Sequence, residues 1–191
     1  EKSRKDFSDI SKIVGESYFN LGKYEAAIPY LKNYKGTKGK WNNTDFYQLG
    51  YAFYKQNDFE NAIAYFNKII DQKNAVSQNA YYHLAECYLN TGKKNEALNA
   101  FKTASEMDFN LKIKEDAALN YAKLSYEEGN PFENVADVLQ NYLKNYPNST
   151  SYKEINQLIV YSFIHQQDYE GALNYLKKKK TDDNTALSLE V

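Results

Sequence analysis

The chain has 191 residues, of which 42% are hydrophobic and 26% are charged, and its 24 Lys and Arg residues nearly balance 25 Asp and Glu residues. This composition supports a packed core and excludes a disordered polyelectrolyte. The net charge of -1 leaves no excess of basic residues for phosphate contacts, so no nucleic acid is expected as a partner.

Two further classes of protein are excluded by simple inspection. No continuous apolar run is long enough to span a bilayer, so no membrane insertion is predicted in this segment. Cys87 is the only cysteine, which rules out an intramolecular disulfide and a zinc site built from cysteines. The chain starts without Met, signal peptide or lipidation motif, and we interpret it as a piece of a longer protein.

Apolar residues recur at helical spacing in nearly every segment, which predicts an all-α fold. The predicted helices form five pairs, each joined by a short polar turn. In chain order the pairs are 8–21 with 24–35, 43–56 with 59–71, 78–91 with 94–106, 113–128 with 131–145, and 151–166 with 169–179. The segments Asn57-Asp58-Phe59-Glu60 and Ser151-Tyr152-Lys153-Glu154 have the pattern of capping boxes. Pro131 is predicted in the first turn of its helix, where a proline is accepted.

The turns inside the pairs recur at a nearly constant interval. Gly22, Asn57 and Gly92 follow one another at 35 residues, Gly129 comes 37 residues later, and Gln167 another 38. A fixed interval of this length is the signature of a repeat protein in which successive helix pairs stack on one another. The small residues Gly15 and Gly50 are expected where two helix backbones approach closely, as are Ala27, Ala62, Ala85, Ala97 and Ala172.

The repeated positions carry a recognisable pattern. The second unit has Phe46, Leu49, Gly50 and Phe53, followed by Ala62 and Phe66. This pattern resembles the tetratricopeptide repeat, with its aromatic-x2-Leu-Gly-x2-Tyr and Ala-x3-Phe spacings. The other units match less completely, the fourth departs most, and the resemblance extends over about residues 8–180.

The resemblance implies a right-handed α-α superhelix of about ten antiparallel helices, taken from a longer bacterial protein. A single array would extend over 1–191, with units at about 8–42, 43–77, 78–112, 113–150 and 151–184. Residues 185–191 are expected to begin a further helix that is cut short.

No known catalytic motif is present, so the chain is not expected to be an enzyme. His83 and His165 fall in different units, and neither a metal nor a cofactor is expected. Cys87 is interpreted as a small buried residue. Lys32, Lys35, Lys38 and Lys40 are interpreted as a hydrated linker, with an acidic partner as the alternative, and Lys177–Lys180 as a solvated helix end.

The resemblance also implies a concave surface lined by the first helix of each unit, where this family usually binds peptides. From the core positions we predict that this surface is rich in tyrosine, which suits an extended or helical partner segment. Its predicted members are Tyr47, Gln48, Tyr51, Tyr54, Tyr82, His83, Glu86, Asn120, Lys123, Tyr126, Gln157 and Tyr161. These tyrosines could instead only join neighbouring units.

Some members of the family grip a peptide carboxylate with basic and amide side chains in three consecutive units. The matching positions here hold Lys12, Glu16, Gln48, Asn79 and His83, so that function is not expected because Glu16 would repel the carboxylate. The hypothesis is a non-enzymatic adaptor that binds a protein or peptide partner.

Two other classes of function remain open from the sequence. One is carbohydrate binding in a cell-envelope uptake system, because tyrosines stack on sugar rings. The other is an architectural spacer or a homo-oligomer interface. The bias toward Asn, Lys, Tyr and Ile suggests an AT-rich bacterial genome and a place in the periplasm or outer membrane, with the cytoplasm as the alternative.

Overall fold

The computed structural model describes residues 2–69 and 73–180. Within those ranges the chain forms ten α-helices, and the only β-type pairing there is an isolated bridge between Thr37 and Lys40. The helices are α1 (Lys2–Asn20), α2 (Tyr24–Asn33), α3 (Asn43–Lys55), α4 (Phe59–Phe66), α5 (Ala75–Asn90), α6 (Lys94–Ser105), α7 (Leu111–Glu128), α8 (Val135–Asn145), α9 (Tyr152–His165) and α10 (Tyr169–Lys180). The predicted all-α helical-repeat fold is confirmed. The further helix expected at 185–191 lies outside the described residues.

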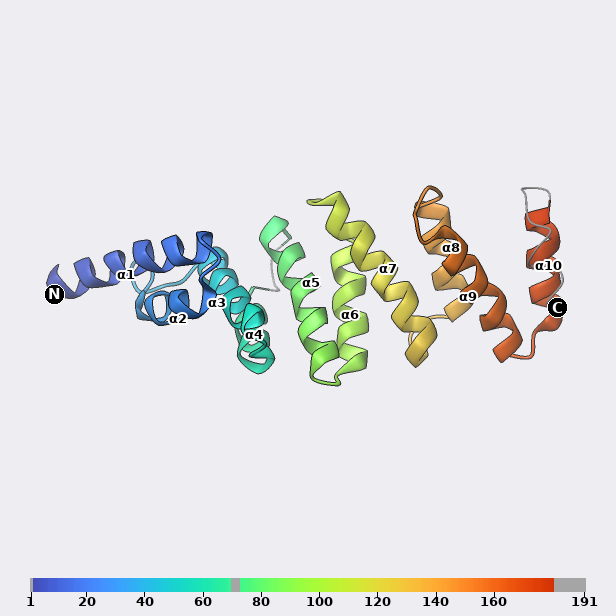
Figure 1. The fold of residues 1–191 in the computed structure, drawn as a ribbon, viewed down its shortest axis with the longest axis horizontal. Coiled ribbons are helices and arrows are strands. Elements are labelled where there is room, and N and C mark those ends of the chain that lie inside the picture. Colours follow the sequence, from blue (N-terminus) through green and yellow to red (C-terminus); the bar gives the residue numbers. More distant parts are fainter. Residues whose placement is uncertain (1, 70–72, 181–191) are drawn as a thin grey trace. The chain divides into compact units, whose positions relative to one another are not determined.

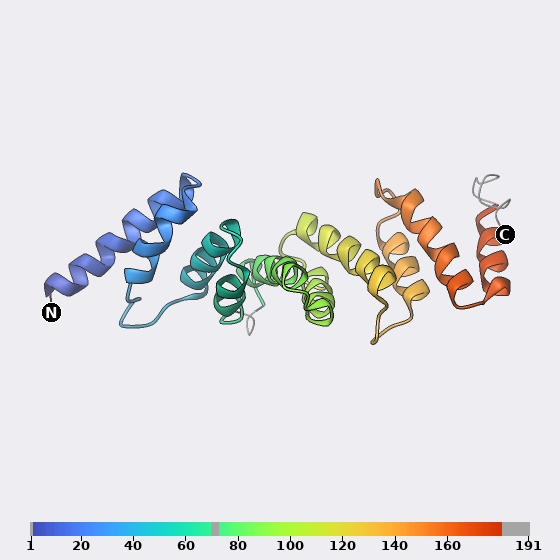
Figure 2. The same ribbon diagram turned by 60° about the horizontal axis from the view of Figure 1, so that its bottom comes forward.

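The chain divides into two compact units, Glu1–Ala117 and Ala118–Val191, and α7 contributes to both. In the first unit α1 packs on α2, α3 on α4 and α5 on α6, and each pair also contacts the next through α2 with α3 and α4 with α5 (Figure 1). In the second unit α9 packs on both α8 and α10 (Figure 2). Each unit is therefore a stack of antiparallel helices in chain order.

The turn inside each pair reverses the chain through one residue with left-handed backbone. Its φ is 70° at Gly22, 58° at Asn57, 74° at Gly92, 76° at Gly129 and 59° at Gln167. These are the same five positions whose spacing identifies the repeat in the sequence. The conformation suits glycine because it has no Cβ, and Asn and Gln adopt it here at a conformational cost.

Hydrogen bonds explain why the chain turns at these positions. In the first pair the Gly22 N–H donates to the Phe19 carbonyl and the Lys23 N–H donates to the Tyr18 carbonyl, both at 2.9 Å. This pair of bonds satisfies carbonyls at the helix end in the Schellman arrangement. The same two bonds recur around Asn57, Gly92 and Gln167.

Three predicted helix boundaries were wrong. Helix α1 begins at Lys2 rather than at residue 8, and α4 ends at Phe66 rather than at residue 71. Helix α5 begins at Ala75 rather than at residue 78, because the Asn74 side chain accepts the Ser77 N–H at 2.9 Å and caps it.

A fourth boundary, the start of α8, was also wrong. Pro131 was predicted in its first turn but lies in the preceding connection, and the helix begins at Val135. The Asn134 side chain accepts the N–H groups of Ala136 at 2.9 Å and Asp137 at 3.3 Å. An Asn cap therefore outweighs the proline as a start signal.

The two predicted capping boxes were also wrong. Asp58, rather than Asn57, caps α4 by accepting the N–H three residues later at 3.3 Å. Ser151 makes no side-chain capping bond at the start of α9. A complete capping box is present at α3, where Asn42 and Asp45 each accept the other's backbone N–H at 2.9 Å.

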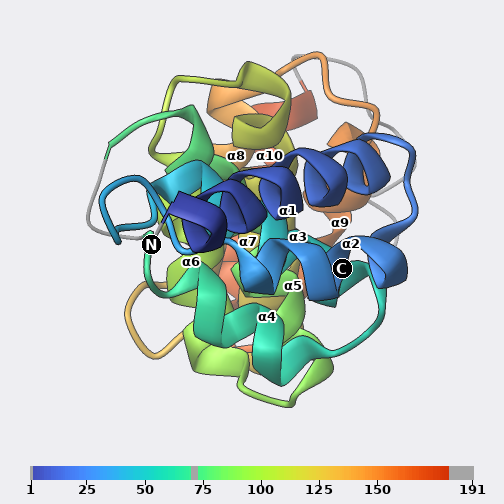
Figure 3. The same cartoon turned by 90° about the vertical axis from the view of Figure 1, so that its left-hand side faces the viewer.

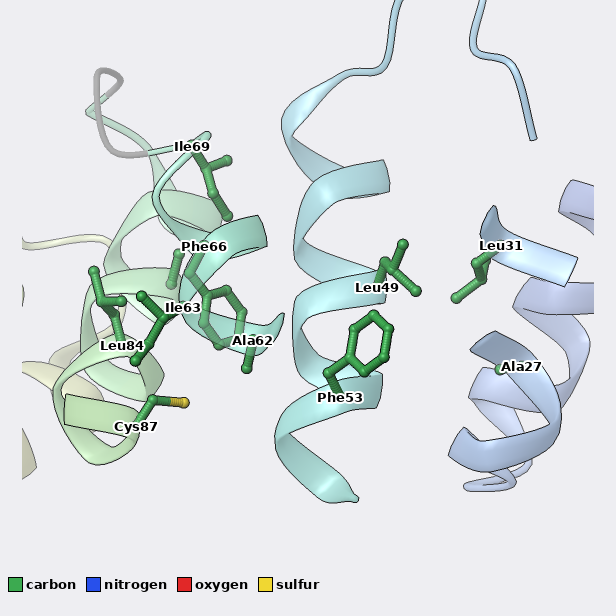
Figure 4. Packing of buried hydrophobic residues seen from close by; sticks show 11 residues of the cluster. Ala27, Leu31, Leu49, Phe53, Ala62, Ile63, Phe66, Ile69, Leu84 and Cys87 are labelled. Atoms are coloured by element: carbon green, nitrogen blue, oxygen red, sulfur yellow. The ribbon is translucent and has the colours of Figure 1, made fainter. Parts of the chain in front are cut away.

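The core of the first unit lies between successive helix pairs. Figure 4 shows Leu31 of α2 and Leu49 of α3 pointing toward one another, and Ile63 of α4 beside Leu84 of α5. A Cβ added at Gly50 would lie 2.9 Å from the Phe66 ring, and one added at Gly15 would lie 3.0 Å from the backbone nitrogen of Leu31, so helices approach closely at both glycines. The predicted small positions on the second helices, Ala27, Ala62, Ala97 and Ala172, are all fully buried.

Candidate binding surface

His83 in α5 lies at the centre of a group of aromatic rings. The ring centroids of Tyr51 and Tyr54 are each 5.0 Å from that of His83. Three more lie farther out, Tyr82 at 5.5 Å, Phe66 at 6.2 Å and Tyr47 at 6.3 Å. We call these six side chains the His83 cluster. It joins the helix pair α3–α4 to α5 and gathers four tyrosines of the predicted surface around one imidazole.

Glu86 adds a negative charge to the His83 cluster. Its Oε2 atom lies 2.8 Å from His83 Nδ1, and the two residues are three positions apart on one face of α5. The Tyr54 side chain also hydrogen-bonds to Glu86. The His83 and Glu86 side chains remain 17% and 29% exposed, so a partner can reach both.

Burial raises the pKa of the Tyr47 and Tyr54 hydroxyls above the ordinary value of 10.0, and the Glu86 carboxylate raises both further. The pKa of Tyr51 is also raised, by burial and then by Tyr24. A negatively charged phenolate is disfavoured in each case because of desolvation and the neighbouring carboxylate. These phenols therefore stay protonated and can donate hydrogen bonds.

The aromatic surface extends beyond the His83 cluster onto the first helix pair. Phe19 of α1, Tyr24 of α2 and Tyr51 form a triangle with centroid distances of 5.4, 5.5 and 5.7 Å. Tyr24 was not among the predicted members because it begins a second helix, whereas the prediction used first helices only. Its place after the turn at Gly22 is the signal that could have identified it.

Part of this aromatic area belongs to the repeat packing. Tyr47 packs on Phe66 with centroids 5.8 Å apart, and Tyr82, 35 residues later, packs on Phe101 at the same distance. The two contacts occupy equivalent positions in successive units. Tyr47 and Tyr82 therefore also pack against the second helix of their own pair.

Gln48 was also predicted on the surface. Its Oε1 atom is buried and has no hydrogen-bond partner among the described residues. Its side chain is half-buried, so it is at most a marginal member of the surface.

The other five predicted members lie on α7 and α9, in the second unit. Lys123 Nζ is 2.8 Å from Glu154 Oε1, so the lysine forms an ion pair within the chain. Tyr126 stacks on His165 with ring centroids 5.8 Å apart. Tyr161 is 39% exposed, Gln157 is exposed and Asn120 is half-buried. The twelve predicted residues thus form two groups, one in each unit.

Lys12 and Glu16, two of the positions that would bind a peptide carboxylate, make contacts within the chain instead. Lys12 Nζ lies 2.8 Å from the buried carboxylate of Asp45 and 3.8 Å from Glu16. It also lies 4.6 Å from the centre of the Tyr34 ring. The Lys12 ammonium group is therefore paired with carboxylates of its own chain.

The connection after α2, which the sequence analysis interprets as a hydrated linker, contains a tight turn. Thr37 and Lys40 pair across a tight turn in which Lys38 and Gly39 have φ of 51° and 78°. Trp41 anchors the turn, because its Nε1 donates to the Tyr34 carbonyl at 2.9 Å. The four lysine side chains are nevertheless exposed.

Residues typical of metal and thiol chemistry are dispersed. Among the described residues, no group of three or more His, Cys, Asp or Glu side chains could hold a metal ion. Burial raises the pKa of the Cys87 thiol to about 12, so this cysteine is an inert core residue as predicted. None of the described helices is long and apolar enough to cross a membrane.

Family models match three stretches of the chain. Residues 13–34 and 116–149 match two models of the tetratricopeptide repeat, and residues 36–104 match the model for anaphase-promoting complex, cyclosome, subunit 3. No curated protein matches the chain.

Several solved structures have the same fold. A crystal structure of MamA is 16% identical, with a TM-score of 0.62 over 95% of this chain and 97% of that one. MamA from Desulfovibrio magneticus RS-1 is 17% identical, with a TM-score of 0.60 over 94% and 98%. A Podospora anserina putative kinesin light chain with nearly identical TPR-like repeats is 11% identical, with a TM-score of 0.56 over 92% and 97%.

Proposed function

The chain is a tetratricopeptide-repeat protein, and from that premise we propose that it is a non-enzymatic scaffold that binds a segment of a partner protein. The proposed binding surface is the His83 cluster together with Glu86, Phe19 and Tyr24. Stacked helix pairs offer extended surfaces of this kind, and their rigidity holds the contact residues in place before the partner arrives.

A single observation carries this proposal. Half-buried tyrosines from α3 and α5 converge on His83 within 5.0 to 6.3 Å, and Glu86 supplies a partly exposed acceptor at the same place. Such rings contribute much apolar area with little loss of side-chain entropy, and each phenol adds a polar atom. Aromatic residues held this way are typical of the few positions that dominate binding energy at protein interfaces.

The chemistry of the surface indicates what it would hold. Ring faces accept apolar side chains, the protonated phenols donate to backbone carbonyls, and Glu86 accepts from N–H groups or pairs with a cation. Lys55 Nζ already lies 6.0 Å from the ring centres of both Tyr51 and Tyr54, so these faces tolerate a positive charge. We expect an extended or helical segment that combines apolar side chains with a Lys or Arg.

Affinity capture from a lysate of the source organism tests the proposal. The unmodified chain is compared with a Tyr51→Ala, Tyr54→Ala variant and with a Tyr30→Ala control, because Tyr30 is 38% exposed on α2 and lies outside the His83 cluster. Circular dichroism first establishes that all three are folded. A partner retained by the unmodified chain and the control, but lost by the double variant, supports the proposal.

Other outcomes contradict it. Equal capture by all three proteins would place recognition elsewhere, for example on the exposed lysines of the turn before Trp41. If no protein is retained and a glycan array gives a signal that depends on Tyr51, the surface binds carbohydrate instead.

A further inference from the structure

Four aromatic side chains in the first two helix pairs form a row of nearly parallel rings. The Tyr34 and Trp41 rings have centroids 6.4 Å apart and planes at 24°. Trp41 and Tyr65 follow at 6.1 Å and 22°, and Tyr65 and Phe53 at 5.7 Å and 12°. Phe46 of α3 lies 5.3 Å from Trp41. Tyr34 and Phe53 are buried, whereas Trp41, Phe46 and Tyr65 are half-buried and reach the surface.

Two lysine ammonium groups lie over these rings. Lys68 Nζ is 4.5 Å from the centre of the Tyr65 ring and 5.4 Å from that of Phe46. Lys32 Nζ is 5.9 Å from the centre of the Phe53 ring. Both lysines are exposed, and neither forms an ion pair with a carboxylate of the described residues. Because a ring face attracts an ammonium group without neutralising it, each lysine presents a positioned charge at the surface.

The connection between α2 and α3 adds positive charge beside the rings. In Figure 3 it loops outward at the left of the view, to one side of α1 and α2. Its exposed lysines precede Trp41 in the chain and are Lys35, Lys38 and Lys40. The only carboxylate side chain in residues 31–46 belongs to Asp45, which is buried and paired with a lysine of α1. The surface around Trp41 is therefore positively charged.

This surface uses a different side of α3 from the His83 cluster. Phe46 and Phe53 are seven residues apart, so they share one side of the helix. Tyr51 and Tyr54 lie along another side, where Glu86 of α5 accompanies them. The two surfaces therefore suit partner segments of opposite charge.

We propose that the positive surface binds an acidic segment of a partner protein, in which Asp or Glu residues are interspersed with apolar ones. We call it the Trp41 surface, and its members are Trp41, Phe46, Tyr65, Lys32 and Lys68. Carboxylates of the segment pair with the two lysine ammonium groups, and its apolar side chains pack on the half-buried rings. The lysines of the connection attract the segment from a distance and need no fixed position for this.

The geometry favours a carboxylate-bearing peptide over a single-stranded nucleic acid. Bases bind by stacking on ring faces that the protein leaves open. Here Trp41 is stacked with both Tyr34 and Tyr65, and Lys68 lies over Tyr65, so ring faces are already in use within the chain. Pairing with a carboxylate needs only the ammonium groups, which are exposed.

The fluorescence of Trp41 tests the proposal, because this residue is the only tryptophan of the chain. The probe is a short fluorescein-labelled peptide in which pairs of Glu alternate with single Leu, and the control peptide has Gln in place of Glu. We expect the Glu peptide to bind saturably by fluorescence anisotropy, and its unlabelled form to change the Trp41 emission over the same concentration range. Binding should weaken as NaCl is raised, because salt screens exposed ion pairs. The Gln peptide should give neither signal.

Charge reversal at the two positioned lysines provides the matched variants. We expect Lys32→Glu, Lys68→Glu to weaken binding of the Glu peptide by about tenfold, because two attractive pairs become repulsive. Lys112→Glu, Lys153→Glu changes the net charge equally at exposed positions in the first turns of α7 and α9, and should bind like the unmodified chain. Circular dichroism verifies that each protein is folded. If the first variant does not fold, Lys32→Gln, Lys68→Gln replaces it and should weaken binding by a smaller factor.

Three results would overturn the proposal. One is a Trp41 emission that the Glu peptide leaves unchanged, and another is an equal loss of binding in the two charge-reversed variants, which would reduce the effect to net charge. The third is tighter binding of oligothymidylate than of the Glu peptide, which would identify a nucleic-acid site instead. The outcome is independent of the His83 cluster, since the Tyr51→Ala, Tyr54→Ala variant should bind the Glu peptide unchanged.

Discussion

The backbone N–H of Asn110 donates a hydrogen bond of 2.7 Å to the side-chain oxygen of the fully buried Gln78, 32 residues earlier. The Gln78 amide in turn donates to the carbonyls of Ala104, Met107 and Asn110 at 3.1, 2.6 and 3.2 Å. At the equivalent position of the first helix pair, the Ser8 hydroxyl accepts the Lys35 N–H at 2.9 Å. In both helix pairs, a polar side chain on the first helix fixes the connection that follows the second helix.

Replacing Gln78 should therefore destabilise the first unit strongly. In a Gln78→Leu variant, the Asn110 N–H and the carbonyls of the connection lose their partner in a buried place, and we expect a loss of about 2–4 kcal/mol in the free energy of unfolding. Urea unfolding followed by circular dichroism measures it. Asn79→Ala is the control, because Asn79 is next to Gln78 in the chain but is partly exposed. It should change the free energy of unfolding by less than about 0.5 kcal/mol. Similar losses in both variants would contradict the role assigned to Gln78.

Glycine at the two non-glycine turns should stabilise the protein. Asn57 and Gln167 have φ of 58° and 59°, where a side chain is strained. We expect Asn57→Gly and Gln167→Gly to raise the free energy of unfolding by about 0.5–1 kcal/mol, with the larger gain at Gln167 because Asn tolerates this conformation better than Gln.

The reverse change provides the control. A Cβ at Gly92 would meet nothing within 4 Å, so Gly92→Ala tests the conformational cost alone and should lower stability by about 1 kcal/mol. Melting temperatures that move together in all three variants would rule out this explanation of the turns.

Gly50 should not accept even a methyl group. Alanine favours a helix over glycine by about 1 kcal/mol, but a Cβ at this position would lie 2.9 Å from the Phe66 ring. We expect Gly50→Ala to lower the free energy of unfolding by about 1–3 kcal/mol through overpacking. In a Gly50→Ala, Phe66→Leu double variant the two losses should be less than additive, because the smaller side chain makes room. Strict additivity would show that the two residues do not press on one another.

Stability should fall at high pH because of the buried phenols. The folded-state pKa values of Tyr47 and Tyr54 are raised above the ordinary 10.0 of the unfolded chain. Above about pH 10 the unfolded state therefore loses protons that the folded state retains, and unfolding becomes more favourable as pH rises. A Tyr47→Phe, Tyr54→Phe variant should lose less stability between pH 9 and 11, because phenylalanine has no hydroxyl proton to release on unfolding. Equal pH dependence in both proteins would argue against the protonated phenols.

The regular features of the fold could be predicted from the sequence because they depend on local spacing. The interval from Gly22 to Asn57 marks the turns, and Gly50 marks a close approach of helices, and both appear in the structure. Helix ends were harder because Asn134 and Pro131 compete as start signals. The outcome depends on which backbone N–H groups the Asn side chain reaches.

The candidate surface was only partly predictable for a related reason. Helical spacing identifies Tyr51 and Tyr54 as neighbours on one side of α3, but it does not show that they converge on His83 of the next pair. That convergence depends on how two pairs stack, as does the contribution of Tyr24 from a second helix.

Photo-crosslinking from position 51 tests the central claim most directly, because it records which part of the surface a partner touches. A photoreactive phenylalanine analogue replaces Tyr51 in one protein and the exposed Tyr30 in another, and each is irradiated with the captured partner before mass spectrometry. We predict that position 51 crosslinks to one segment of the partner containing apolar residues and a Lys or Arg, and that position 30 gives no such product. Crosslinking from position 30 alone, or equally from both positions, would contradict binding at the His83 cluster.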